Sequence, residues 1–234
     1  MWNPRKIEYP GYAPSTDTGK ACLKEIGSYV ANRLNAAKGI AVTPEYIKSL
    51  GKSEPYGYRN VLFHPRTIVD KANDNSTVQM FRTGCFNVLS LGDVESAEVA
   101  ALIKATKIAC REIDVLILPH HGANNGFITS DLLDELKPKL AVCGVNFDNQ
   151  YGHVANEIRA LLARKGIKLA TTVRGDVLVH STNGTSKVEW IDAMGDNTNI
   201  HDAGDFEPKK FDMLLHPDAM RARIQGAPYR SIKR

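Results

Sequence analysis

A short apolar run that ends in two histidines places the strongest constraint on the fold. Residues 114–123 read Asp-Val-Leu-Ile-Leu-Pro-His-His-Gly-Ala. The aliphatic segment 115–118 is too short for a helix and is followed by proline, so it predicts a strand buried on both faces, with His120 and His121 just past its end. Residues 87–93 repeat this layout and end in Asp93. A carboxylate and imidazoles at neighbouring strand ends suggest a metal site.

The composition is that of a soluble globular chain with one core and decorated ends: 234 residues, of which 24% are charged and 43% hydrophobic. No apolar run approaches the ~18 residues that a membrane span needs, and the amino terminus lacks the apolar region of a secretory signal. The net charge of +4 is too small by itself to indicate nucleic acid. Four cysteines without a Cys-x-x-Cys pair predict reduced, mostly buried thiols and a cytoplasmic location: Cys22, Cys85, Cys110 and Cys143.

Periodicity predicts helices between strands, and therefore an α/β layered domain. Asp17 can cap the first helix, which has Leu23, Ile26, Val30 and Leu34 on one face. The other expected helices cover residues 44–50, 95–109, 129–136 and 153–165. The expected strands cover residues 61–63, 67–69, 115–118, 140–145 and 168–173, with hairpins of 77–82 with 86–91 and of 177–180 with 187–191.

Three segments follow from these patterns. Residues 1–60 are expected to hold loops and helices that are part of the domain or inserted in it. Residues 61–192 form the α/β core, and residues 193–234 form an irregular, basic tail. The tail is either a solvated, partly disordered segment or a basic arm that contacts nucleic acid phosphates.

Three motifs occur in order along the core: Ser-Leu-Gly-Asp at 90–93, the His-His-Gly-Ala segment, and Asn146-x4-Tyr151-Gly152-His153. This series resembles the metallo-β-lactamase-fold hydrolases, in particular the carboxy-terminal domain of ComEC-type competence proteins, over about residues 60–192. The Asn-Asp-Asn-Ser turn at 73–76 also resembles that branch. The family's first motif, His-x-His-x-Asp-His or His-x-Asp-x-Asp-His, does not occur in the chain. The chain therefore looks like the second half of an αββα sandwich, and Ala123 and Val154 replace a usual serine and proline.

The resemblance implies a site with two divalent cations, zinc or manganese, bridged by Asp93. Asp93 could instead cap the helix expected at 95–109. Because neighbouring side chains on extended backbone point opposite ways, we do not expect His120 and His121 to reach one metal together. We expect His120 to be a metal ligand and His121 to contact either a metal-ligating residue or the substrate. Either histidine could instead be a hydrogen-bonded loop histidine.

The third motif lies between an expected strand and an expected helix. The free N–H groups of that helix's amino terminus suit a phosphate. Asn146 and Tyr151 are therefore expected to contact the substrate, and His153 could donate a proton to a leaving oxygen. The alternative is an ordinary helix cap.

The preferred function is a metal-dependent hydrolase of phosphodiester bonds, with a nucleic acid or a nucleotide as substrate. The alternative is a non-catalytic half-domain or pseudoenzyme that acts as a binding or assembly module. In either case one sheet face would lack its covering half, which predicts a complementing amino-terminal half or a homo-oligomer as partner.

Overall fold

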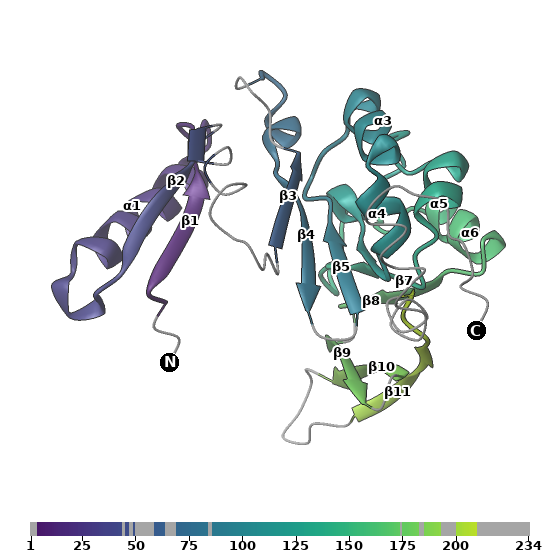
Figure 1. Ribbon diagram of the computed structural model, residues 1–234. Coiled ribbons are helices and arrows are strands. Elements are labelled where there is room, and N and C mark those ends of the chain that lie inside the picture. Colours follow the sequence, from purple (N-terminus) through teal and green to yellow (C-terminus); the bar gives the residue numbers. More distant parts are fainter. Residues whose placement is uncertain are drawn as a thin grey trace, which may run out of the picture. The chain divides into compact units, whose positions relative to one another are not determined.

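The computed structural model describes residues 4–43, 45–46, 49, 59–63, 69–83, 86–173, 175–182, 185–192 and 200–209. The predicted helix at 44–50, the predicted strand at 67–69, Cys85 and most of the basic tail fall wholly or mostly outside these residues. The chain forms two compact units, residues 1–56 with 64–70 and residues 57–63 with 71–234, which we describe separately (Figure 1).

The first unit is a β-α-β arrangement. Strands β1 (Lys6–Pro10) and β2 (Lys38–Val42) pair in parallel, and α1 (Asp17–Ala31) connects them, followed by the 3-10 turn η1 (Arg33–Asn35). The expectation of only loops and helices here was wrong, because β1 and β2 satisfy each other's backbone groups. Leu34, expected on the apolar face of the helix, lies beyond its end and is 89% exposed.

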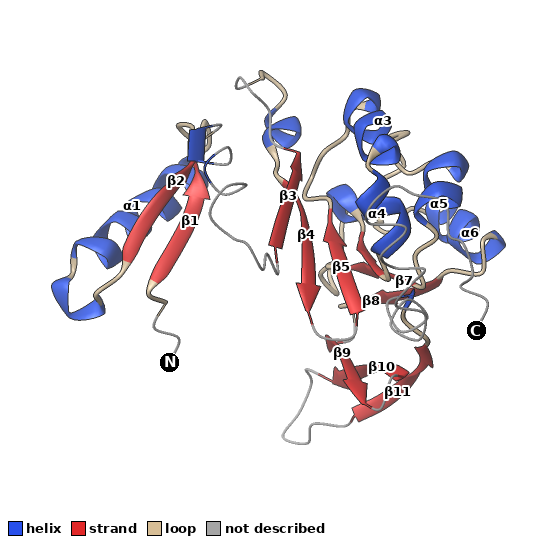
Figure 2. Ribbon diagram, viewed as in Figure 1, coloured by secondary structure: helices blue, strands red, loops and turns tan. Residues whose placement is uncertain are grey.

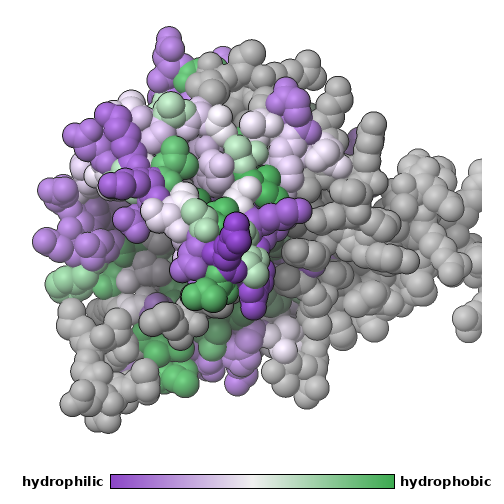
Figure 3. Space-filling model, turned by 90° about the vertical axis from the view of Figure 1, so that its left-hand side faces the viewer, coloured by the Kyte–Doolittle hydropathy of each residue, from purple (hydrophilic) through white to green (hydrophobic). Residues whose placement is uncertain are grey.

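The N-cap of helix α1 is Thr16 and not Asp17 as predicted, and the Oγ1 of Thr16 accepts a hydrogen bond from Gly19 N at 3.1 Å. No residue of α1 is fully buried. In the face of the molecule drawn in Figure 3, hydrophobic residues appear as separate patches among hydrophilic ones.

The second unit is built on a six-stranded mixed sheet in the order β3-β4-β5-β6-β7-β8. Strands β3 (Arg59–Phe63), β4 (Val78–Thr83) and β5 (Phe86–Ser90) pair antiparallel, whereas β5, β6 (Val115–Ile117), β7 (Leu140–Cys143) and β8 (Lys168–Thr171) are parallel. Helices α3 (Ala97–Ala105), α4 (Lys107–Glu112), α5 (Ser130–Leu136) and α6 (Asn156–Arg164) lie along one side of this sheet (Figure 2). The α/β class predicted from the sequence is confirmed.

Helix boundaries differ from the prediction at one place for a local reason. The single helix expected at 95–109 is two helices that meet at Thr106. Thr106 bonds back to the preceding turn, with its Oγ1 donating to Leu102 O at 2.8 Å and its N–H to Ile103 O at 2.9 Å. The N-cap of α3 is Ser96, so Asp93 does not cap this helix.

The strands alternate between two cores. Leu116 and Ala141 face the helices, whereas their neighbours Val115 and Leu140 face a second, three-stranded sheet in the order β11-β10-β9. That sheet consists of β9 (Gly175–Thr182), β10 (Thr185–Asp192) and β11 (Ile200–Phe206), and Val188 and Phe206 anchor it to the second face. Each fully buried aliphatic side chain in these cores contributes about 1.5–3 kcal/mol.

Strand β11 corrects two expectations. Residues 200–206 were predicted to be irregular, but they pair with the open edge of β10, whose N–H and C=O groups would otherwise be unpaired. The second sheet face is also not bare as expected, because β9–β11 cover part of it.

The second unit buries a carboxylate, and its cysteines differ in exposure. Asp114, at the beginning of β6, is fully buried and accepts hydrogen bonds from Asn87 N at 2.9 Å and Lys209 N at 2.7 Å. Cys143 of this unit is buried and Cys110 is intermediate, whereas Cys22 of the first unit is exposed, so the prediction of mostly buried thiols was wrong for the described cysteines. Within the described part of the chain, no helix is long and apolar enough to span a membrane.

Candidate functional site

The parallel strands bring the predicted site residues to one edge of the six-stranded sheet. Asp93 follows β5, His120 and His121 follow β6, and Asn146 follows β7. Since β5, β6 and β7 are parallel neighbours, their carboxyl ends meet at the same edge. In open α/β sheets this edge is where ligands bind.

The two histidines form a left-handed turn and not the extended backbone that we expected. They lie in the 3-10 turn η3 (Pro119–Gly122), where φ and ψ are 44° and 48° for His120 and 52° and 26° for His121. The turn is docked on the Gly-Asp loop, because His120 N donates to Gly92 O at 3.1 Å. Two successive non-glycine residues with positive φ are uncommon and occur mainly at functional sites.

Gly122 completes the turn and joins it to the loop between β7 and α6. Its φ is 73°, and a Cβ there would lie 2.6 Å from Cγ1 of Val154. Its carbonyl accepts a hydrogen bond from Ala155 N at 3.1 Å. Glycine is therefore required for both the backbone conformation and the close approach of Val154.

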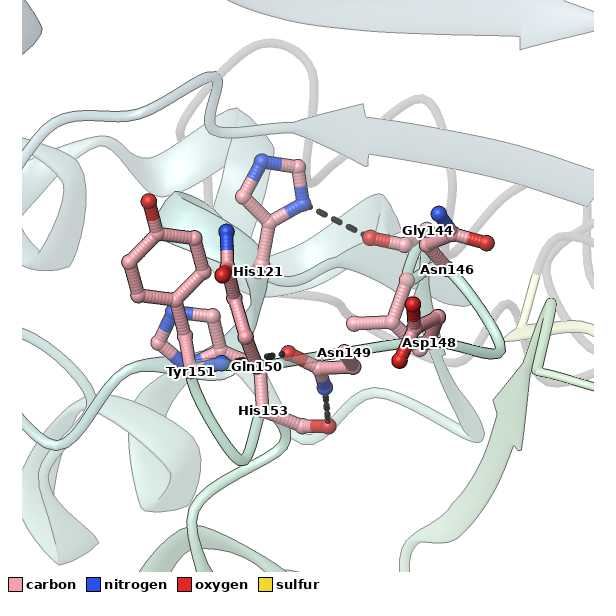
Figure 4. Close-up of a pocket in the computed structure, with 9 residues that line it drawn as sticks. His121, Gly144, Asn146, Asp148, Asn149, Gln150, Tyr151 and His153 are labelled. Carbon is pink, nitrogen blue, oxygen red and sulfur yellow. Dashed lines mark hydrogen bonds between the residues drawn. The ribbon is translucent and has the colours of Figure 1, made fainter.

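A pocket of about 330 Å³ opens between this turn and the loop. All four residues that the sequence suggested for substrate contact line it together: His121, Asn146, Tyr151 and His153 (Figure 4). The sequence reasoning missed Asp148, Asn149 and Gln150, which also line the pocket. Their position between two motif residues was the only available signal.

Three other aromatic rings of the site lie close to the ring of His153. The ring centroids of Tyr151 and His153 are 5.9 Å apart at an interplanar angle of 20°, and those of His121 and His153 are 6.2 Å apart at 23°. His120 approaches the same ring at 5.9 Å with a tilt of 54°. Tyr151 is 76% exposed, so its side chain is accessible to a ligand.

Burial and the nearby charges of His120 and His121 lower the pKa of His153 below its ordinary value. His153 is therefore neutral at pH 7 in the free protein. A neutral imidazole accepts a proton, so the donor role suggested from the sequence does not suit the free protein.

His121 has a fixed orientation. Its Nδ1 lies 2.7 Å from Gly144 O, the residue that follows β7 (Figure 4). Because a carbonyl only accepts, Nδ1 donates this hydrogen bond. The loop beyond is also held, since Thr172 Oγ1 accepts from Val145 N at 2.8 Å and donates to Val145 O at 2.9 Å.

Glu95 is a site neighbour that the sequence reasoning did not identify. Its Oε1 lies 2.7 Å from Nδ1 of His120, but the two atoms are not aligned as a hydrogen bond, so the contact is electrostatic. Lys71 and Asn73 bind the same carboxylate, and they lower the pKa of Glu95, with Lys71 the larger cause. The Asn-rich turn at 73–76 was the sequence signal for this arrangement.

That turn also holds the Gly-Asp loop. Ser76 Oγ accepts a hydrogen bond from Asp93 N at 3.1 Å, and Asp74 Oδ1 accepts from Glu95 N and Ser96 N at 2.7 and 2.9 Å. The turn, η2 (Ala72–Asn75), thus fixes the backbone on both sides of the Asp93 carboxylate.

The described residues do not complete the metal site that the resemblance implies. No three His, Cys, Asp or Glu side chains among them converge closely enough to hold an ion. His120 faces Glu95, whose charge is already offset by Lys71.

Comparison with known proteins gives one distant relative. The chain is 27% identical over 126 residues to ComE operon protein 3 of Bacillus subtilis (strain 168). The match covers 53% of this chain and 14% of that protein, so it compares only a small part of the relative. No family model matches the chain.

Proposed function

We propose that this chain is the second half of a metallo-β-lactamase-like phosphodiester hydrolase, related to part of ComE operon protein 3, and that its histidine-lined pocket binds a nucleic acid or nucleotide. One observation carries the proposal: residues from two separate sequence motifs, His121 on one side and Asn146, Tyr151 and His153 on the other, line one pocket at the carboxyl edge of the parallel strands. The distant similarity to the Bacillus protein supports it.

The chemistry of the pocket suits a phosphodiester next to an aromatic base. The exposed face of Tyr151 can stack on a base, an interaction of about 1–3 kcal/mol. In Figure 4 the rings of His121, Tyr151 and His153 lie on one side of the pocket, where their nitrogens and hydroxyl can contact phosphate oxygens. Neutral His153 can accept the proton of an attacking water as the new oxygen–phosphorus bond forms and the bond from phosphorus to the leaving oxygen breaks. The protonated His153 can then return that proton to the leaving oxygen.

Dependence on zinc or manganese is part of the proposal, with Asp93 and His120 as donors and the other ligands from outside the described residues. Two donors make an incomplete site, so the chain alone should bind zinc weakly. In calorimetric titrations, Asp93→Ala should abolish this binding. Asp114→Ala should not, because Asp114 lies at the opposite end of its strand. Retention of two zinc equivalents after dialysis would contradict this expectation.

The second candidate is a binding or assembly module without catalysis. It is favoured by the finding that the described His, Cys, Asp and Glu residues form no cluster of three donors. In this case the pocket binds its ligand and releases it unchanged, and a complementing half or a second copy of the chain would be its partner.

Ligand binding tests what the two candidates share. A thymidine dinucleotide with a single phosphodiester should shift the imidazole resonances of His121 and His153 in NMR spectra. Tyr151→Ala and His153→Ala should each weaken its binding by about tenfold, in line with about 1–3 kcal/mol for a stacked base. His180→Ala is the matched control, because His180 pairs with Glu189 on the three-stranded sheet. Equal affinities in all variants would exclude the pocket as the site.

Turnover separates the candidates. Hydrolysis of bis(p-nitrophenyl) phosphate with added manganese or zinc is measured for the chain alone and with a complementing half. Activity that Asp93→Asn abolishes supports the hydrolase. Dinucleotide binding without turnover under both conditions supports the binding module.

A further inference from the structure

The loop at 144–155, which connects β7 to α6, is anchored at both ends. Near its start, the N–H and carbonyl of Val145 both bond to the hydroxyl of Thr172. Near its end, Val154 O accepts a hydrogen bond from Arg159 Nε at 2.8 Å. Ordering free backbone costs conformational entropy, so the middle of the loop, which carries the tyrosine and the histidine of the pocket, needs contacts of its own.

Asn149 supplies these contacts. Its Oδ1 accepts a hydrogen bond from Tyr151 N at 3.2 Å, and its Nδ2 donates to His153 O (Figure 4). Its backbone carbonyl accepts from Gly152 N at 3.2 Å. Among the residues that the structure describes, no other side chain hydrogen-bonds to the backbone of residues 146–153. One residue thus fixes the backbone of three successive residues.

The two side-chain bonds require an amide. An amide offers an acceptor and a donor side by side, whereas a carboxylate only accepts. Because one partner is an N–H and the other a carbonyl, they also determine which way the amide points. The oxygen and one N–H of Asn149 are therefore used within the loop. Its contribution to ligand binding comes through the residues that it holds.

Those residues carry the accessible rings of the pocket. Tyr151 is largely exposed, and its ring lies 5.9 Å from that of His153. An exposed side chain loses freedom when a ligand binds, and this cost is smaller when the free protein already holds the side chain in place. Asn146, which the sequence suggested, lines the same pocket, but the bonds to residues 151 and 153 come from Asn149.

We propose that Asn149 is a positioning residue, which holds Tyr151 and His153 ready for a nucleotide through its hydrogen bonds to Tyr151 N and His153 O. The proposal rests on the proposed function for the identity of the ligand. The positioning itself concerns the loop alone and is tested without a ligand.

The test is NMR spectroscopy of the full chain, below its melting temperature, with and without the thymidine dinucleotide. Asn149→Ala should weaken dinucleotide binding by about three- to tenfold, the cost of ordering a freed side chain. The nuclear Overhauser contact between the rings of Tyr151 and His153 should disappear in this variant, a change that lower stability alone does not cause. Asn149→Ser keeps an acceptor for the N–H of residue 151, so it should weaken binding less than alanine does.

Asn125→Ala is the matched control. Asn125 Oδ1 also accepts a hydrogen bond from the N–H two residues on, that of Phe127, at 3.1 Å, and Asn125 is not among the residues that line the pocket. This variant should lower the melting temperature but leave the affinity and the ring contact unchanged.

The proposal is overturned if Asn149→Ala keeps either the ring contact or the wild-type affinity, or if Asn125→Ala weakens binding as much. Failure of the wild type to bind the dinucleotide would count against the proposed function instead. In that case the ring contact alone decides whether Asn149 positions the two residues, so either proposal can fail alone.

Discussion

Replacement of Gly122 by alanine tests whether the histidine turn is held against the loop between β7 and α6. Residue 122 has a φ of 73°, and the left-handed conformation costs a non-glycine residue about 1–2 kcal/mol. The new Cβ would also lie 2.6 Å from Val154 Cγ1, and overpacking of this kind costs about 1–3 kcal/mol. The free energy of unfolding should therefore fall by about 2–5 kcal/mol.

Gly126→Ala is the matched control for backbone strain. Gly126 has a φ of 86°, but nothing lies within 4 Å of a Cβ added there. Both variants lose similar entropy in the unfolded chain, so this contribution cancels in the comparison. The difference between them isolates the contact with Val154, and we expect about 1–3 kcal/mol.

Urea denaturation followed by circular dichroism measures these free energies. In the double variant Gly122→Ala/Val154→Ala the 2.6 Å contact is absent and only the Val154 Cβ remains, at 3.2 Å. The double variant should therefore be more stable than the sum of the single variants predicts. If Gly122→Ala costs no more than Gly126→Ala, the turn is not packed on Val154 and the reasoning about the site fails.

Three further outcomes are expected. Lys71 lowers the pKa of Glu95, so ionised Glu95 stabilises the fold above its ordinary pKa. This contribution is lost as the pH falls through the lowered pKa. The difference in the free energy of unfolding between wild type and Glu95→Gln should therefore shrink between pH 6 and 3, as measured by denaturation curves. Burial raises the pKa of the Cys143 thiol to about 11, so a disulfide reagent at pH 8 should modify exposed Cys22 at once and Cys143 only after unfolding. Asp148→Asn should strengthen dinucleotide binding without metal, because it removes a negative charge from the pocket; weaker binding would contradict this.

The sequence determined the elements whose signals are local. The aliphatic run 115–118 and the apolar spacing in 129–136 predicted β6 and α5 to within a residue or two. The regular alternation of strands and helices was enough for the α/β class, and chain order placed Asp93 and His120 at ends of neighbouring strands. These features depend on side-chain periodicity within about ten residues, which the sequence displays directly.

Tertiary structure decided what depends on contacts between distant segments. Glu95 meets Lys71 and His120 across 24 and 25 positions of the chain, and no local pattern encodes such a meeting. Strand β11 forms only because β10 offers an open edge, and the left-handed backbone of the two histidines is held by the loops around it. Gly122 lets Val154 approach the histidine turn, and the pocket is lined by residues of this turn and of the loop that carries Val154. The site therefore depends on the packing of two loops that the sequence presents only as separate motifs.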